Sequence, residues 1–94
     1  MTKRFYIISY DLKNPGRDYS SLYTAIKSDR DWQHPLESTW IVWTTESAND
    51  IYKTVKPTLD SNDPIFISEL NIMDRQGWLA KSCWEWIKQR MDNV

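Results

Sequence analysis

The chain has 94 residues, which is enough for one small domain with a single hydrophobic core and too few for two. Its 40% hydrophobic and 27% charged residues, with two glycines and four prolines, exclude a disordered or fibrous protein. The formal net charge of −1 argues against a protein that neutralises duplex phosphates with its whole surface.

The charge distribution and the numbers of cysteine and histidine residues restrict the class of protein further. Residues 1–30 contain six basic and three acidic side chains, whereas the rest of the chain contains six basic and ten acidic ones, so a local basic patch and a mixed solvated surface both remain open. A single cysteine and a single histidine exclude an internal disulfide and a four-ligand zinc site within one chain. No apolar run approaches membrane-spanning length and no secretory signal is recognisable, so we expect a cytoplasmic protein without a membrane partner.

The first half of the chain predicts a strand, a helix and a hairpin. Residues 4–10 are rich in aromatic and β-branched side chains on both alternating sides, so we expect a strand that is covered on both faces. After loop-like residues 11–16, Tyr19, Leu22, Tyr23 and Ile26 recur at helical spacing. They predict a helix over about 18–29 with Asp18 as N-cap. A weak arm over 32–35 and a strand over 39–44, again apolar on both sides, form the predicted hairpin.

The second half predicts a helix, a strand and a further helix. Ser47 is the expected N-cap of the first helix, which Pro57 ends or kinks. After the turn-like residues 60–63, residues 65–70 form the last strand. Residues 76–91 predict a C-terminal helix in which Trp84 and Trp86 lie about 200° apart. One of these two side chains should therefore be exposed or lie at an interface, so a homodimer and a partly exposed tryptophan lying flat on its own domain both remain open.

This order of elements predicts an α+β fold over residues 1–72: a ferredoxin-like βαββαβ antiparallel sheet with two helices on one face. The two central strands then need cover on their second face. Residues 73–94 are the expected cover, as a C-terminal helical extension packed on the same domain or on a dimer partner.

Asp11 is the sharpest candidate for chemistry because it directly follows a predicted central strand. A carboxylate anchored there can bind magnesium through oxygen, and two of them at a dimer axis would make a plausible site for an activated water that attacks a phosphodiester. The alternative is that Asp11 caps the following turn through backbone N–H groups.

Each of the other candidate functional residues also has a structural interpretation. His34 is a potential general acid or base, or part of a bend set by Pro35, and Cys83 fits a small core residue better than a nucleophile. Exposed aromatic side chains could stack on bases while Lys13, Arg17 and Arg30 meet phosphate, or the aromatics could simply fill the core.

Two segments carry a resemblance to a known family. Tyr-Ile-Ile-Ser-Tyr-Asp-Leu ending at Leu12 and Trp-Gln-His-Pro-Leu-Glu-Ser-Thr-Trp-Ile-Val ending at Val42 resemble the SinR-like proteins, relatives of the CRISPR-associated Cas-two family, over about residues 4–72. The resemblance implies a ferredoxin-like homodimer. In some members it implies metal-dependent cleavage of RNA or DNA by Asp11 paired across the dimer, whereas other members are structural subunits that hold DNA beside an integrase.

The sequence therefore predicts a small Cas-two-like homodimer that engages nucleic acid or a nucleotide, with a possible magnesium-dependent endoribonuclease activity. Asp11 is the expected catalytic and metal-binding residue, and the expected ligand-binding residues are Tyr10, Lys13, Arg17, His34 and Ser38. The alternative function is a non-catalytic module that sequesters a nucleotide, including a cyclic nucleotide, or a protein partner in antiviral defence and the conflict between host and mobile element.

Overall fold

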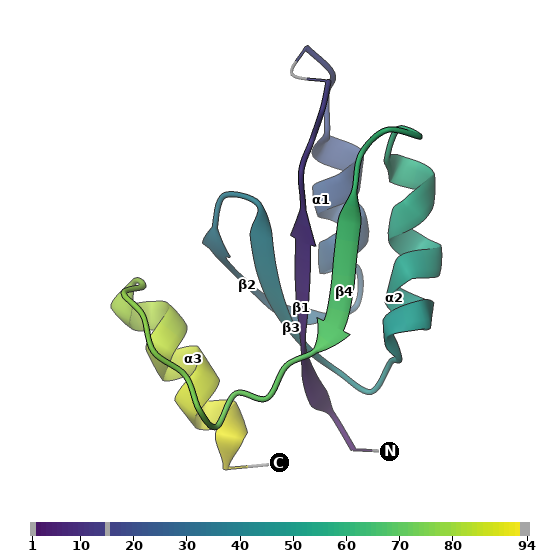
Figure 1. Ribbon diagram of the computed structural model, residues 1–94. Coiled ribbons are helices and arrows are strands. Elements are labelled where there is room, and N and C mark those ends of the chain that lie inside the picture. The colour runs from purple at the N-terminus through teal and green to yellow at the C-terminus, as the bar shows by residue number, and fades with distance from the viewer. Residues whose placement is uncertain (1, 15, 93–94) are drawn as a thin grey trace.

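The computed structural model describes residues 2–14 and 16–92 and has an α+β architecture (Figure 1). Pro15, which belongs to the predicted loop over residues 11–16, lies outside the described residues. The described elements are β1 (Arg4–Tyr10), α1 (Ser20–Lys27), β2 (Asp31–Leu36), β3 (Thr39–Thr44), α2 (Ala48–Val55), the 3-10 helix η1 (Lys56–Thr58), β4 (Ile65–Glu69) and α3 (Lys81–Met91).

The four strands form one antiparallel sheet in the order β2-β3-β1-β4. β1 and β3 are therefore the two central strands, as their two-sided apolar pattern predicted. Phe5 pairs with Trp43 and Ile8 with Trp40, so each central strand presents large apolar side chains to both faces of the sheet. β2 is an edge strand, as predicted for its proline-containing segment.

We call the face covered by α1 and α2 the inner face. Each helix contributes an apolar pair at i and i+4, and Leu22, Ile26, Ile51 and Val55 are all fully buried against the sheet. From the sheet, Tyr6, Ile8, Tyr10, Trp40 and Val42 complete this core.

The helix boundaries differ from the predicted ones where local hydrogen bonds decide them. α1 is shorter than expected, because Asp18 accepts the backbone N–H of Ser20 at 2.9 Å and the helix begins after Tyr19, not after Asp18. The expected start of α2 is confirmed: Ser47 and Asp50 form a reciprocal capping box. Pro57 lies in η1, which follows α2 directly.

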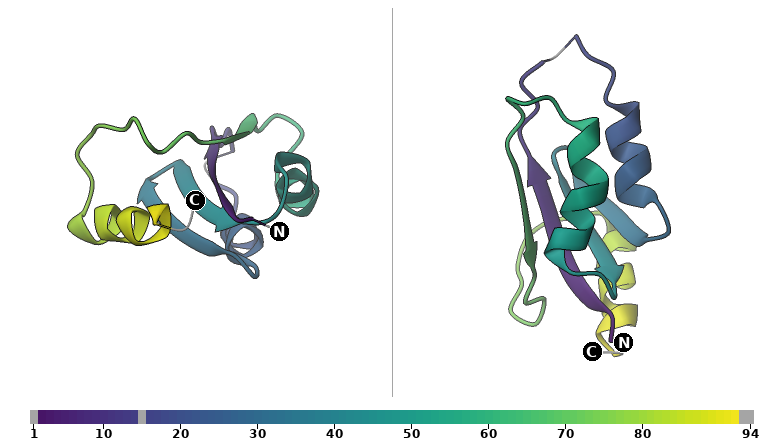
Figure 2. Two further views of the ribbon diagram at one scale, coloured as in Figure 1. Left: turned by 90° about the horizontal axis from the view of Figure 1, so that it is seen from below. Right: turned by 90° about the vertical axis from the view of Figure 1, so that its right-hand side faces the viewer.

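The opposite, outer face is covered by α3 at one end only. Figures 1 and 2 show α3 on the other side of the sheet from α1 and α2, beside the end where β1 begins. Cys83, Trp86 and Ile87 of α3 pack there, with Ile72, against the outer face. The sheet side chains that they cover are Phe5, Ile41 and Trp43.

A polar latch fixes α3 to the edge strand β2. Asp31 accepts the indole N–H of Trp86 at 2.9 Å and the Nε–H of Arg90 at 2.6 Å. Trp86 is buried and Trp84 is partly buried against the same cluster, so the expected division between one core and one exposed tryptophan is wrong for this pair. In the same C-terminal segment, Trp78 is 94% exposed. Residues 76–80 are not helical as predicted, and α3 begins only at Lys81.

The remaining part of the outer face is open, at the end where β1 finishes. We call it the open half-face, and cross-strand register defines it: Ser9 pairs with Thr39 and Phe66, Ile7 with Ser68, and Leu36 with Thr39. Phe66 is 65% exposed and Leu36 is 55% exposed. The expectation that both faces of the central strands are covered thus holds for only one end of the outer face.

Among the described residues, no helix has the length and apolar character needed to cross a lipid bilayer.

Candidate functional site

The site expected from the sequence lies where β1 runs into the β1–α1 loop. Asp11 continues the ladder beyond β1, because its backbone N–H donates to the carbonyl of Pro64 at 3.1 Å. Its side chain is 68% exposed, and with Ser9 and Phe66 it lines a shallow depression of about 350 Å³. Asp11 is therefore held on a rigid sheet at the margin of the open half-face.

The carboxylate of Asp11 already has a cationic partner. The ammonium of Lys13 lies 2.5 Å from its Oδ2, and both side chains are largely exposed. The expected capping of the turn by Asp11 is not what the described hydrogen bonds show, since its side chain binds this ammonium group. An incoming cation or phosphate would compete for one member of this surface pair, which is a weak interaction in water.

Asp63 is the residue that organises the loops around Asp11, although the sequence suggested only a turn there. Its side chain is 7% exposed and accepts three hydrogen bonds: from the backbone N–H of Lys13 at 2.8 Å, from the hydroxyl of Tyr19 at 2.8 Å and from the backbone N–H of Asp60 at 3.0 Å. It thereby joins the β1–α1 loop to the loop before β4. Because both oxygens of this buried carboxylate accept hydrogen bonds, its role is structural, and we call this set of three hydrogen bonds the staple.

Arg17 contacts residues of this staple and is not free for phosphate. It forms an ion pair with Asp60, donates to the carbonyl of Thr58 at 3.1 Å and lies over the ring of Tyr19. Asn14 also donates to Asp60, at 2.5 Å. The contacts of Arg17 with Asp60, Thr58 and Tyr19 thus give it a structural role in these loops.

A second group of expected ligand residues surrounds the buried Trp40. The indole N–H of Trp40 donates to the hydroxyl of Tyr10 at 3.0 Å, and the ring of His34 stacks on Trp40 at 3.8 Å and 10°. Tyr10 is 6% exposed, and burial raises its pKa to about 12. Ser38 lies in the turn beyond β2, where its carbonyl accepts the backbone N–H of Tyr10 at 3.1 Å. The expected site residues thus fall into two groups, one at Asp11 and one at Trp40.

Two further candidates have structural roles. Arg30, expected to meet phosphate, has a 2% exposed side chain that binds both carboxylate oxygens of Glu46, the hydroxyl of Thr54 and two carbonyls at the end of α1. Burial raises the pKa of the Cys83 thiol, which lies in the core beneath α3. This fits the core role expected for Cys83.

Among the described residues, no group of three or more His, Cys, Asp or Glu side chains is close enough to hold a metal ion. Magnesium is commonly held by one or two carboxylates together with waters and substrate phosphates. Asp11 fits such a role only with a second carboxylate or a substrate phosphate beside it.

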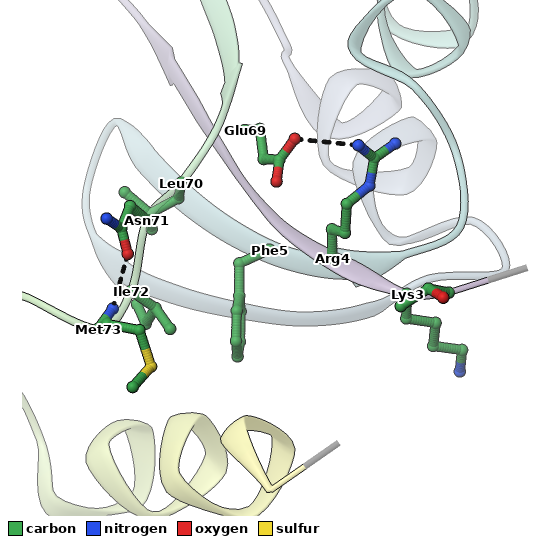
Figure 3. Close-up of a pocket in the computed structure, with 9 residues that line it drawn as sticks. Lys3, Arg4, Phe5, Glu69, Leu70, Asn71, Ile72 and Met73 are labelled. Atoms are coloured by element: carbon green, nitrogen blue, oxygen red, sulfur yellow. Dashed lines mark hydrogen bonds and ion pairs between the residues drawn. The ribbon is translucent and has the colours of Figure 1, made fainter. Parts of the chain in front are cut away.

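A further cavity lies elsewhere, and none of the expected site residues lines it (Figure 3). Its volume is about 430 Å³, and it lies between the start of β1 and the segment after β4. Phe5, Leu70 and Ile72 give it apolar walls, and the ion pair between Arg4 and Glu69, at 3.0 Å, lies at one side. No sequence signal marked it, because it forms from two segments more than sixty residues apart.

Comparisons with models of protein families, with curated proteins and with solved structures find no match to this chain.

Proposed function

We propose that this protein is a Cas-two-like homodimer with a ferredoxin-like domain, and that it engages RNA at the end of the sheet marked by Asp11. The observation that carries the proposal is the position of an exposed carboxylate directly after the central strand β1, at the margin of the open half-face. The element order and the strand order β2-β3-β1-β4 support the ferredoxin-like topology.

The open half-face supports the homodimer. Its six residues are Ile7, Ser9, Leu36, Thr39, Phe66 and Ser68, and no charged side chain is among them. An uncharged patch with a protruding Phe66 can face its own copy across a two-fold axis without like-charge repulsion. Phe66 and Leu36 are its exposed large apolar side chains, and exposed apolar side chains grouped on one face mark interaction sites.

We further propose that the two-fold axis of this dimer runs along β1. Asp11 adjoins Ser9 and Phe66 in the depression at the margin of the open half-face. With that axis, a copy seated on the open half-face would have its own Asp11 at the same end of the dimer. A pair of carboxylates has the oxygen donors that magnesium prefers, and the bound ion would supply charge stabilisation and an activated water for phosphodiester cleavage.

The experiment is an RNA cleavage assay on the purified protein with magnesium. Wild-type protein is compared with Asp11→Asn and with Asp74→Asn, which removes an exposed carboxylate from the segment before α3. We expect cleavage by wild type and Asp74→Asn and a loss of at least a hundredfold in Asp11→Asn. Equal cleavage by all three would identify a contaminating nuclease and refute the catalytic role of Asp11.

A second candidate function is sequestration of a nucleotide without catalysis, and the cavity beside Phe5 favours it. Its volume of about 430 Å³ lies within the range of small-molecule sites. It combines apolar walls with the guanidinium of Arg4 and the side-chain amide of Asn71, which suits a base attached to a phosphate.

Thermal-shift measurements with mono-, di- and cyclic nucleotides test this second function, because a ligand that binds only the folded state raises the melting temperature. Met73 lies at the cavity and is 65% exposed, so Met73→Glu adds a negative charge there without disturbing the core. A shift that Met73→Glu abolishes would support sequestration. The absence of a shift with every nucleotide would refute it and direct attention to a protein partner.

A further inference from the structure

Aromatic side chains line the inner face of the sheet along its β2 edge, beside α1. Trp32 and His34 stand two residues apart on β2, and the buried Trp40 of β3 backs both of them. Trp32 is 36% exposed and His34 is exposed, whereas Trp40 is 1% exposed. Two accessible rings thus rest on one buried ring.

These rings are held in place before any ligand arrives. His34 stacks nearly parallel on Trp40, and its Nε2 lies 2.9 Å from the carbonyl oxygen of Glu37. Since a carbonyl oxygen can only accept, Nε2 is the donor in this hydrogen bond. The ring of Tyr23 meets His34 edge-on at 5.7 Å. Rings fixed in this way lose little conformational entropy when a ligand stacks on them.

A cation accompanies the accessible rings. The ammonium of Lys27, at the end of α1, lies 4.8 Å from the ring centre of Trp32 and 5.9 Å from that of Trp40. Asp31, the acidic residue of β2, does not oppose it, because its carboxylate is bound to Trp86 and Arg90 of α3 on the outer face. The site therefore combines π-faces with an adjacent positive charge.

We propose that Trp32, His34 and Lys27 form a stacking site for the bases of single-stranded RNA. Base stacking on aromatic side chains beside a cation for the phosphate is the general chemistry of single-strand binding. The edge position of β2 leaves this side of the sheet accessible to an extended strand. The inference rests on the proposed function only in that the ligand is RNA, and it places part of the binding energy away from Asp11.

The test is a fluorescence anisotropy titration with a labelled oligouridine of about ten nucleotides. The buffer contains a chelator, so that binding is measured without metal-dependent cleavage. We expect Trp32→Ala and His34→Ala each to weaken binding about tenfold, and Trp32→Phe to retain most of the affinity because phenylalanine still stacks. Lys27→Ala should reduce the slope of log affinity against log salt by about 0.7.

Two matched controls remove the same side-chain types elsewhere. Trp78→Ala removes a 94% exposed tryptophan, and Lys88→Ala removes an exposed lysine of α3. Both should bind oligouridine as wild type does. Melting temperatures check that each variant is folded.

The outcomes separate this inference from the proposed function. If Trp32→Ala and His34→Ala bind as wild type does, or if Trp78→Ala is as weak as Trp32→Ala, the stacking site is refuted while RNA engagement stands. If the Trp32 and His34 variants lose binding while Asp11→Asn cleaves like wild type, the stacking site stands and the catalytic role of Asp11 fails. A wild-type protein that binds no oligouridine refutes both.

Discussion

Asp63 and Tyr19 join the two loops at the end of β1 through one buried hydrogen bond. The hydroxyl of Tyr19 donates to Oδ2 of Asp63 at 2.8 Å, and the two residues are 9% and 7% exposed. The other oxygen of Asp63 accepts the backbone N–H of Lys13, two residues beyond Asp11. The position of the candidate catalytic carboxylate therefore depends on a second, buried carboxylate.

Removing this staple should destabilise the protein and loosen the loop that contains Asp11. Tyr19→Phe removes one donor and should lower the free energy of unfolding by about 1 kcal/mol, whereas Asp63→Ala leaves three donors without their acceptor and should cost about 3 kcal/mol. Urea denaturation measures both values. Asp74→Asn, an exposed control, should leave stability unchanged, and equal stability of all variants would contradict the staple.

Tyr10 should make the stability of the fold sensitive to alkali. Burial raises its pKa to about 12 from 10.0 in the free side chain. A raised pKa stabilises the folded state below pH 10, and this contribution is lost as the pH rises from 10 to 12. Urea denaturation of wild type across this range should show the loss. Tyr10→Phe should show a smaller loss over the same range, since its side chain does not ionise.

Tyr10→Phe also has an effect at neutral pH. The buried indole N–H of Trp40 loses its acceptor, which should lower the free energy of unfolding by about 1–3 kcal/mol. Tyr52→Phe changes an exposed tyrosine of α2 and is the matched control. A Tyr10→Phe protein as stable as this control at every pH would show that the Trp40 contact contributes nothing.

The latch between Asp31 and α3 should open in acid. Burial raises the pKa of Asp31, but the hydrogen bonds from Arg90 and Trp86 outweigh it and hold the pKa below its ordinary value of 3.8. A lowered pKa stabilises the folded state above about pH 4, and this contribution is lost as the pH falls below 3.8. Hydrogen exchange of the α3 amides should therefore accelerate below that pH.

Substitution tests the same latch at neutral pH. Asp31→Asn should accelerate exchange in α3 and lower stability by about 1 kcal/mol, a value discounted because both side chains are partly exposed. Glu85→Gln removes an exposed α3 carboxylate 3.9 Å from Lys81 and should change little. Unchanged exchange in Asp31→Asn would mean that apolar contacts alone hold α3.

Patterns among residues close in sequence predicted much of the fold, because helix capping and the alternation of side chains along a strand depend on neighbouring residues. The capping box of Ser47 and Asp50 is visible in four consecutive residues, and alternating apolar sets identified β1 and β3 as central. The site was harder to predict. Arg30 looked like a free cation because Glu46, its partner, lies sixteen residues away, and Asp63 looked like a turn residue because its donors come from a distant loop.

The C-terminal segment illustrates a second limit. A helix over residues 76–91 fits the apolar spacing, yet α3 begins only at Lys81. The preceding residues 70–80 have turn, bend and irregular conformations, and Ile72 among them packs in the outer-face cluster with α3. Long-range packing, which helical periodicity does not encode, decided where α3 begins.

Chemical crosslinking tests whether two copies bring Asp11 to one axis. Asp11→Cys places an exposed thiol at the margin of the open half-face, while the native Cys83 is buried and its thiol pKa is raised, so it reacts slowly. A short thiol-specific crosslinker should produce a covalent dimer of Asp11→Cys. Cysteine introduced at Asp74 is the control, and equal crosslinking at both positions would contradict a two-fold axis near Asp11.

The most direct test of the proposed dimer is the mass of the protein in solution. Light scattering on a size-exclusion column at micromolar concentration should give twice the 11.3 kDa of one chain for wild type. Phe66→Glu, which adds a charge at a 65% exposed position of the open half-face, should give 11.3 kDa, and a cooperative thermal unfolding transition checks that it is folded. A wild-type mass of 11.3 kDa, or a Phe66→Glu protein that remains dimeric, would contradict the account.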